Sequence, residues 1–408
     1  KSKRDAERIP TLDSYLKENP DFTSATWYNP IPDADLCVQS IKTIKALCED
    51  NGINFTLIAS PVYEKELRCY NSEELLAYYK EIAEVTDFWN FSGYTDITYE
   101  PRYFYDSMHF RNCVGDMMLA KIFNDTSLYV PESFGDYITS ENADELLEKA
   151  FTAGEKPTNQ YARLAVLMYH HFTKEHTDTS SVSAQTLDEQ LTALEKAGYT
   201  AVTLDQLRAY THKGTPLPQK PYLITIDDGY SSALEIAAPV FEKHGVSAVI
   251  SIIGCSIGKD TYKDTGIPIT EHFTLEEADP FVEKGIFTLI SHTFDMHQVE
   301  HDGDGHREGV LQKAGEGETE YLNELHNDLE KMCSALGEVN ALAYPYGKHS
   351  ELSEVFLSDN GIDITFTTKW GSNEIVKGIP QTLRLLSRIT VEEATTGEKL
   401  IEYIESAG

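Results

Sequence analysis

In the C-terminal part of the chain, short apolar runs alternate with stretches in which apolar residues recur at helical spacing. The run 164–169 predicts a buried strand. Capping boxes that begin at Thr186 and Thr203 predict the starts of two helices, which Gly198 and Gly214 end. Such alternation indicates parallel βα units, and therefore an α/β fold built as an open doubly wound sheet or a barrel. The further predicted strands are 222–226, 246–253, 287–290 and 341–343.

The chain divides into two blocks. The segment 149–162 contains Gly, Pro and Asn between two periodic regions, so it is predicted to be a linker between domains 1–148 and 163–408. The tract 299–319 is rich in Gly, His and acidic residues and predicts an exposed loop. Within the first block we expect a strand at 53–60 and helices at 72–83 and 113–123.

Charge narrows the range of partners. With 67 acidic and 34 basic residues the net charge is −33, which disfavours nucleic acid and anionic lipid surfaces and favours neutral or cationic partners such as amidosugar polymers. The alternative is that the acidity only keeps the protein soluble. No apolar run approaches the ~18–20 residues of a membrane span. Because the chain starts at Lys1 without Met or a signal-peptide pattern, we expect that its N-terminus, with any export or anchoring signal, has been removed.

Side chains that can bind a metal or transfer a proton follow the predicted strands directly. Asp227 and Asp228 follow one strand, His292 and His297 another, and His170 a third. Two histidines and one carboxylate form a ligand set typical of catalytic zinc, and a second carboxylate can act as general base. Taken alone, the Asp-Asp-Gly segment is typical of an ordinary turn, and the histidines are typical of a solvated loop. Their order at strand ends of one βα domain favours a metal site.

Three motifs extend this pattern. They are Thr-Ile-Asp-Asp-Gly at 225–229, Ser-His-Thr-Phe-Asp-Met-His at 291–297 and Ala-Tyr-Pro-Tyr-Gly at 343–347. Together they resemble the T-F-D-D-G, H-[ST]-x-x-H and R-x-P-Y-G motifs of the NodB-type polysaccharide deacetylases, carbohydrate esterase family 4. The resemblance covers about 245 residues and implies a distorted (β/α) barrel.

The resemblance also implies roles. Asp227 would be the general base, and the backbone N–H of Tyr346 would help to hold the oxyanion. Pro345 and Tyr346 would line the substrate site. The metal ligands would be Asp228, His292 and His297, holding a divalent ion for which zinc is expected and cobalt or nickel would also suit the ligand set.

Three departures from the family pattern matter. The two histidines are five residues apart instead of four, which resembles the branch that acts on poly-β-1,6-N-acetylglucosamine. Ala343 stands in place of an Arg, so another group must orient Asp227; Arg388 is the candidate, with a structural salt bridge as the alternative. The family's late L-x-x-H motif is not found, and we predict His170 as the general acid, with a packing role as the alternative. Trp370 is a candidate for stacking on a sugar ring, or an ordinary packing residue.

The N-terminal block carries a weaker resemblance. Asp106-x-x-His109, followed by a predicted helix, resembles the closing motif of SGNH/GDSL hydrolases, in which Asp orients a His that activates a serine. The G-D-S block of that family does not occur here. The resemblance therefore implies a partial flavodoxin-like SGNH α/β domain, truncated or degenerate, in which Asp106 and His109 are a vestigial dyad.

The sequence thus predicts metal-dependent hydrolysis of acetamide groups on an N-acetylated surface polysaccharide, with release of acetate. One alternative is a non-catalytic carbohydrate-binding protein that keeps the barrel. Another is a metal-dependent hydrolase of the same fold that acts on a small amide. An extracellular or cell-surface location is implied by the family resemblance alone.

Overall fold

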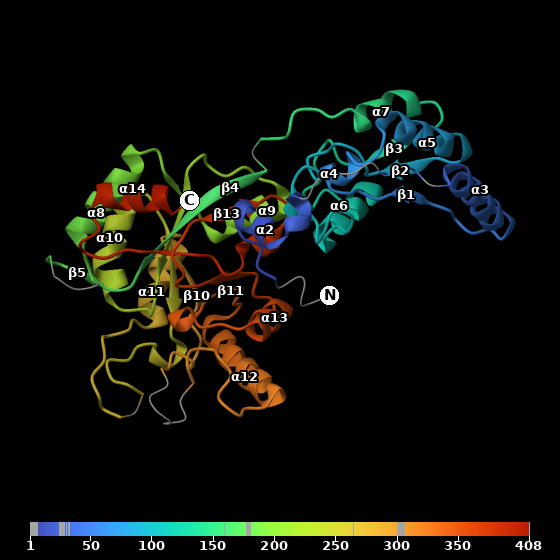
Figure 1. Ribbon diagram of the computed structural model, residues 1–408. Helices are drawn as coiled ribbons and strands as arrows, with labels where there is room; N and C mark the ends of the chain where they lie inside the picture. Colours follow the sequence, from blue (N-terminus) through green and yellow to red (C-terminus); the bar gives the residue numbers. More distant parts are fainter. Residues whose placement is uncertain are drawn as a thin grey trace.

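The computed structural model describes residues 7–23, 29, 31, 33–158, 160–176, 181–263, 265–299 and 307–407. Two blocks are visible, one around a three-stranded sheet and one around a nine-stranded sheet (Figure 1). Helix α7 (Ala143–Phe151) ends the first block, and the long strand β4 (Tyr161–Tyr169) opens the second.

The large sheet is mostly parallel and curls on itself. Its strand order is β12-β11-β10-β9-β8-β4-β13, with β7 beside β8 and β14 beside β4. β13 runs antiparallel to β4, whereas β8 and β14 run parallel to it. Buried apolar side chains fill both faces of the central strands. The other strands are β7 (Thr200–Ala201), β8 (Pro221–Ile226), β9 (Ala248–Ile252), β10 (Phe287–Ser291), β11 (Ala341–Ala343), β12 (Ile364–Phe366), β13 (Asn373–Val376) and β14 (Ile389–Thr390).

A late segment brings the curled sheet back to its start. Leu386 forms a parallel bridge with Phe366 of β12, and Arg388 N–H donates to the Lys369 carbonyl. Three residues after Leu386, Ile389 pairs with Leu167 of β4. The segment therefore spans from the last parallel strand of the sheet to β4, and it gives the distorted barrel that the sequence predicted.

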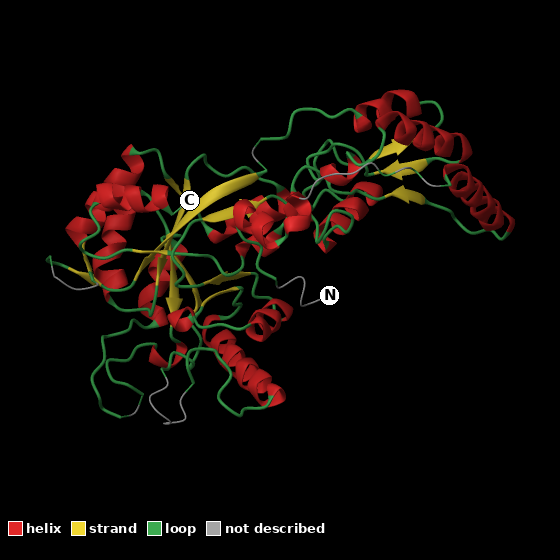
Figure 2. Ribbon diagram, viewed as in Figure 1, coloured by secondary structure: helices red, strands yellow, loops and turns green. Residues whose placement is uncertain are grey.

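Helices form the outer layer of this barrel (Figure 2). α9 (Leu204–Lys213) begins with the predicted capping box at Thr203 and ends at left-handed Gly214. The predicted capping box at Thr186 is wrong, because α8 (Ala184–Lys196) begins earlier and its cap is Ser183, whose hydroxyl accepts the Thr186 N–H. The remaining helices are α10 (Ala238–His244), α11 (Leu275–Glu283), α12 (Glu318–Leu336), α13 (Glu351–Asp359) and α14 (Gly397–Ser406).

The loop expected at 299–319 is only partly as predicted. Residues 300–306 lie outside the described part of the chain, and α12 already begins at Glu318. Arg307 is only 2% exposed, and its guanidinium bonds Glu316 at 2.7 and 2.8 Å and Glu324 at 3.1 Å. The prediction of an exposed loop is therefore wrong at this point, because an ion-pair cluster folds the tract onto α12.

The N-terminal block contains a small sheet. β1 (Leu57–Ala59) pairs parallel with β2 (Phe88–Asn90), which pairs antiparallel with β3 (Asp136–Ile138). Among the described residues of this block, one of the two strand pairs is parallel, and the flavodoxin-like assignment stays a prediction. Its helices and helical turns are α2 (Leu12–Glu18), α3 (Ala34–Asp50), α4 (Glu64–Leu67), α5 (Ser72–Val85), η2 (Pro101–Tyr103) and α6 (Asn112–Phe123).

The two blocks share a core. Val376 and Ile379 of the barrel pack in one cluster with side chains of the N-terminal block, among them Tyr103 and Met117. Arg102 is fully buried between Glu100, at 2.8 Å, and Glu374 of β13, at 2.6 Å. Among the described residues, no helix is both long and apolar enough to cross a membrane.

Candidate active site

The predicted site residues come together at the carboxyl edge of the barrel. Asp227 and Asp228 follow β8, His292 follows β10, and His170 follows β4. The turn Pro345–Gly347 follows β11. Because parallel strands end at the same edge of the barrel, residues far apart in the sequence meet there.

Three side chains form a group that can hold one metal ion. The ligand atoms of Asp228, His292 and His297 all lie within 4.8 Å of one another. Asp228 Oδ1 is 3.6 Å from His292 Nε2 and 3.4 Å from His297 Nε2. Donors about 2.1 Å from a tetrahedral ion stand roughly 3.4 Å apart, so these distances suit a shared ion.

In both histidines, Nε2 is the nitrogen that lies beside Asp228 and could bind an ion, whereas Nδ1 has another partner. His292 Nδ1 lies 2.8 Å from the Ala343 carbonyl, to which it donates, and its Nε2 lone pair is free for a metal. His297 Nδ1 lies 3.1 Å from the Tyr346 hydroxyl. Burial, together with nearby His292, lowers the pKa of His297 to about 4. At neutral pH this imidazole is therefore uncharged, which is the form that binds metals.

The loop between the histidines accommodates the extra residue in their spacing. Thr293 has a left-handed backbone with φ 68°, which costs energy in a β-branched residue. The Asp328 carboxylate of α12 accepts the N–H groups of Phe294 and Asp295, both at 2.8 Å. Asp328 thereby fixes the loop that carries His297.

Asp227 is buried and held from two sides. Arg388 donates to both carboxylate oxygens at 2.8 Å, and the Ser251 hydroxyl donates to Oδ1. Burial alone would raise the pKa of Asp227, but the Arg388 guanidinium and nearby His292 hold it well below its usual range. The carboxylate is therefore ionised, and Arg388, the predicted orienting residue, contacts it directly.

His170 lies on the open side of Asp227. Its Nε2 is 4.0 Å from Asp227 Oδ2, and its side chain is 40% exposed. An imidazole that borders both solvent and the buried carboxylate can exchange protons with a molecule bound there.

The P-Y-G turn is held by local backbone geometry. Pro345 is buried, and Tyr346, 42% exposed, has a left-handed backbone with φ 56°. At Gly347 (φ 67°) a Cβ atom would lie 2.3 Å from Thr368 Oγ1, so this position requires glycine. Trp370 lies in the neighbouring loop, 46% exposed, with its ring edge-to-face on Tyr403.

Two site residues were not predicted from the sequence. Tyr230 hydrogen-bonds the Asp228 carboxylate, and burial with that carboxylate raises the pKa of its hydroxyl above the usual value. Ser251 lies on β9 and contacts Asp227. Their proximity to the Asp-Asp-Gly motif and their strand-end position are the signals that could have found them.

The predicted pair in the N-terminal block does form. His109 Nδ1 lies 2.9 Å from both carboxylate oxygens of Asp106, which also accepts the N–H groups of Met108 and His109. The histidine side chain is 76% exposed. The neighbouring Ser107 hydroxyl donates to Glu66. It therefore does not bond His109, as the nucleophilic serine of an SGNH hydrolase would.

Comparison with known proteins matches the barrel block. Residues 214–364 match the family model described as polysaccharide deacetylase. The chain is 25% identical over 257 residues to YxkH of Bacillus subtilis (strain 168), whose name places it among polysaccharide deacetylases; the match covers 63% of this chain and 80% of YxkH. It is 26% identical over 265 residues to the poly-beta-1,6-N-acetyl-D-glucosamine N-deacetylase of Escherichia coli (strain K12), covering 59% of this chain and 38% of that protein.

A solved structure shares the fold. The de-N-acetylase from Aggregatibacter actinomycetemcomitans superimposes with a TM-score of 0.50 at 19% identity, over 59% of this chain and 99% of that one. The predicted barrel is therefore confirmed. These comparisons do not support the SGNH resemblance of the N-terminal block, which stays a prediction.

Proposed function

We propose that the chain is a polysaccharide deacetylase that hydrolyses acetamide groups on N-acetylglucosamine polymers in a metal-dependent reaction, and the match of residues 214–364 to the polysaccharide deacetylase family model supports this. This proposal depends on one observation, which is that a possible metal site lies next to a possible general base. The triad Asp228, His292 and His297 stands beside an ionised carboxylate, Asp227, which is itself oriented by Arg388. A cell-surface polysaccharide, and hence an extracellular location, is part of the same proposal.

The residues present fit a divalent cation. Two neutral imidazole nitrogens and one carboxylate oxygen at the observed separations form a set that suits zinc, and cobalt or nickel as well. A cation bound there would polarise the acetamide carbonyl and lower the pKa of water. We propose zinc as the native ion.

The protein's own groups complete the reaction. Asp227 accepts the proton of the attacking water, because its carboxylate is ionised and fixed by Arg388 and Ser251. The Tyr346 backbone N–H stabilises the developing oxyanion. His170 donates a proton to the departing nitrogen, which leaves as a free amine while acetate is released. Trp370 and Pro345, with the Tyr346 ring, border the bound sugar.

Acetate release from N-acetylglucosamine oligomers tests this proposal. We expect metal-stripped protein to release no acetate and one equivalent of zinc to restore release, with cobalt and nickel reloading compared in parallel. Simple acetamides serve as a control for the small-amide alternative. Equal turnover of acetamide and oligomer would contradict the assignment to a polysaccharide, and metal binding without any release would favour the non-catalytic carbohydrate-binding alternative.

The His170→Ala variant tests the general acid. We expect turnover of the oligomer to fall by about 10²-fold or more, because the departing nitrogen loses its proton donor. Bound metal, measured after dialysis, should not change, since His170 lies outside the triad. His171→Ala is the matched control, because His171 bonds Ser232 instead of Asp227. Undiminished turnover in His170→Ala would show that His170 only packs.

A further inference from the structure

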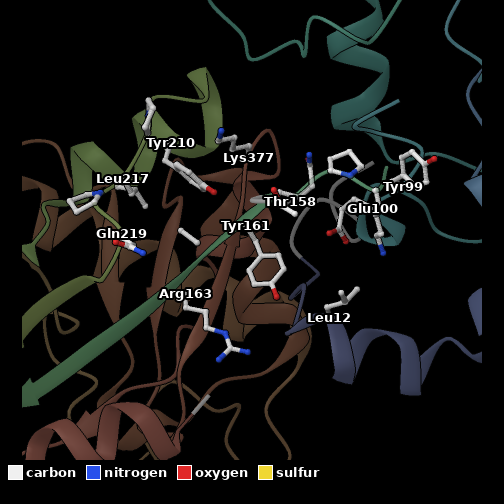
Figure 3. A pocket seen from close by; sticks show the side chains of 16 residues that line it. Leu12, Tyr99, Glu100, Thr158, Tyr161, Arg163, Tyr210, Leu217, Gln219 and Lys377 are labelled. Carbon is white, nitrogen blue, oxygen red and sulfur yellow. The ribbon is translucent and has the colours of Figure 1, made fainter. Parts of the chain in front are cut away.

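A groove lies at the opposite end of the barrel from the proposed active site. It has a volume of about 920 Å³ and is formed by both blocks of the chain together with the segment that joins them (Figure 3). Tyr161 and Arg163, at the start of β4, line this groove, whereas His170 follows the other end of that strand. Nine residues of strand separate the two places by roughly 26 Å.

The lining of the groove is rich in basic residues, although the chain as a whole is strongly acidic. Lys156, Arg163 and Lys377 all border the groove. Among the described residues, the side chains of Lys156 and Arg163 form no hydrogen bond or ion pair, and Lys377 lies over the rings of Tyr129 and Tyr210 at 5.9 and 5.8 Å. In a chain with 67 acidic and 34 basic residues, such unpaired cations at one groove favour an anionic ligand.

Among the described residues that line the groove, Glu100 carries the only carboxylate, and this carboxylate is ion-paired. Both oxygens of Glu100 accept from Arg102, at 2.8 and 3.0 Å, and Arg102 also bonds Glu374. The buried group of Glu100, Glu374 and Arg102 therefore carries one net negative charge, against three positive charges on the groove.

Other groups in the lining suit a sugar. Arg102 covers one face of the Tyr161 ring at 4.8 Å, and in Figure 3 the ring extends into the cavity. Aromatic faces suit the C–H surface of a pyranose. The Gln160 side chain also borders the groove. Its amide N–H groups can donate to a sugar oxygen.

We propose that this groove binds an anionic saccharide chain, one whose sugars carry carboxylate or phosphate groups. The cations bind the acidic groups, Tyr161 stacks on a ring, and the Gln160 amide donates to a sugar oxygen. The deacetylated product proposed above is cationic and would be repelled here, so the ligand of this groove differs from the substrate at the other end of the barrel. The groove would attach the enzyme to an acidic surface polymer, and this binding does not depend on the proposed reaction.

Binding of defined oligomers to the full chain tests the proposal. The probes are hexagalacturonate for carboxylate, phosphorylated maltohexaose for phosphate, and maltohexaose and N-acetylglucosamine hexamer as neutral controls. We expect one or both anionic probes to bind, the neutral ones not to bind, and 1 M salt to abolish binding through screening. The better anionic probe identifies which acidic group the groove prefers.

A charge-matched pair of variants locates the binding. The double variant Lys156→Gln with Arg163→Gln should weaken binding by about tenfold, because two exposed charge contacts are lost. The double variant Lys42→Gln with Lys196→Gln changes net charge equally at exposed positions elsewhere and should not weaken it. Acetate release from short oligomers should be unchanged in both.

Several outcomes would overturn the proposal. They are equal binding of neutral and anionic probes, equal loss in the two double variants, and no binding of either anionic probe at millimolar concentration. Equally tight binding of a hexadeoxyadenylate would assign the groove to polyanions in general and remove the saccharide specificity.

Discussion

The Asp227→Asn variant is expected to lose turnover of N-acetylglucosamine oligomers by about 10²- to 10⁴-fold, the range that a positioned general base contributes. The amide is nearly the same size as the carboxylate but cannot accept the proton of the attacking water. Asp227 contributes no atom to the triad, so the variant should retain bound metal. Acetate release and metal content, measured on the same preparation, test both expectations.

Asp228→Asn is the matched control, because it makes the same change one residue away. This variant should lose metal on dialysis, since Asp228 supplies one of three ligand atoms. Metal lost from Asp227→Asn and kept by Asp228→Asn would reverse the two roles. Full turnover in Asp227→Asn would exclude Asp227 as the base.

Removal of the Arg388 guanidinium should damage both stability and activity. Arg388 is fully buried and donates to both oxygens of Asp227. Arg388→Met leaves a buried carboxylate without a charged partner, and we expect the free energy of unfolding at pH 7 to fall by about 3–5 kcal/mol. Denaturant unfolding of metal-stripped protein measures this loss. Turnover should also fall, because Asp227 loses its orientation.

The pH dependence separates this charge effect from lost packing. In the wild type, Arg388 holds the pKa of Asp227 low, so the pair contributes stability above the unfolded carboxyl pKa of about 3.9, and this is lost as pH falls through the folded pKa. Without Arg388, burial raises the pKa of Asp227, so the variant takes up a proton and recovers as the solution is acidified. The difference in unfolding free energy should therefore shrink from pH 7 to pH 4.

Two further variants make this result decisive. Arg388→Met combined with Asp227→Asn removes both charges and should recover part of the lost stability at pH 7. Arg208→Met breaks a bidentate pair with Asp363 whose side chains are 20% and 34% exposed, and it should cost no more than about 1 kcal/mol. A loss in Arg388→Met that is independent of pH would point to packing alone.

Much of the barrel could be predicted from local pattern. The apolar runs that became β4, β8, β9, β10 and β11 were evident, because a buried parallel strand must be apolar along its length. β1 is shorter than its apolar run suggested, and α8 begins before its predicted cap. The competing Ser183 hydroxyl decided where α8 begins.

The sequence by itself determined the chemistry at the strand ends. Asp227, Asp228, His292 and His297 were identifiable because the donor types and their positions after apolar strands are local properties. It could not decide whether Arg388, 161 residues from Asp227, reaches that carboxylate, because this contact depends on the segment that bridges β12 and β4. Three other features likewise exist only once distant segments pack. They are the contact of Ser251 with Asp227, the hydrogen bonds from the His297 loop to Asp328, and the cationic groove between the blocks. Spacing along the chain fixes which groups a strand end carries, whereas the closure of the barrel and the docking of the two blocks fix which of them meet.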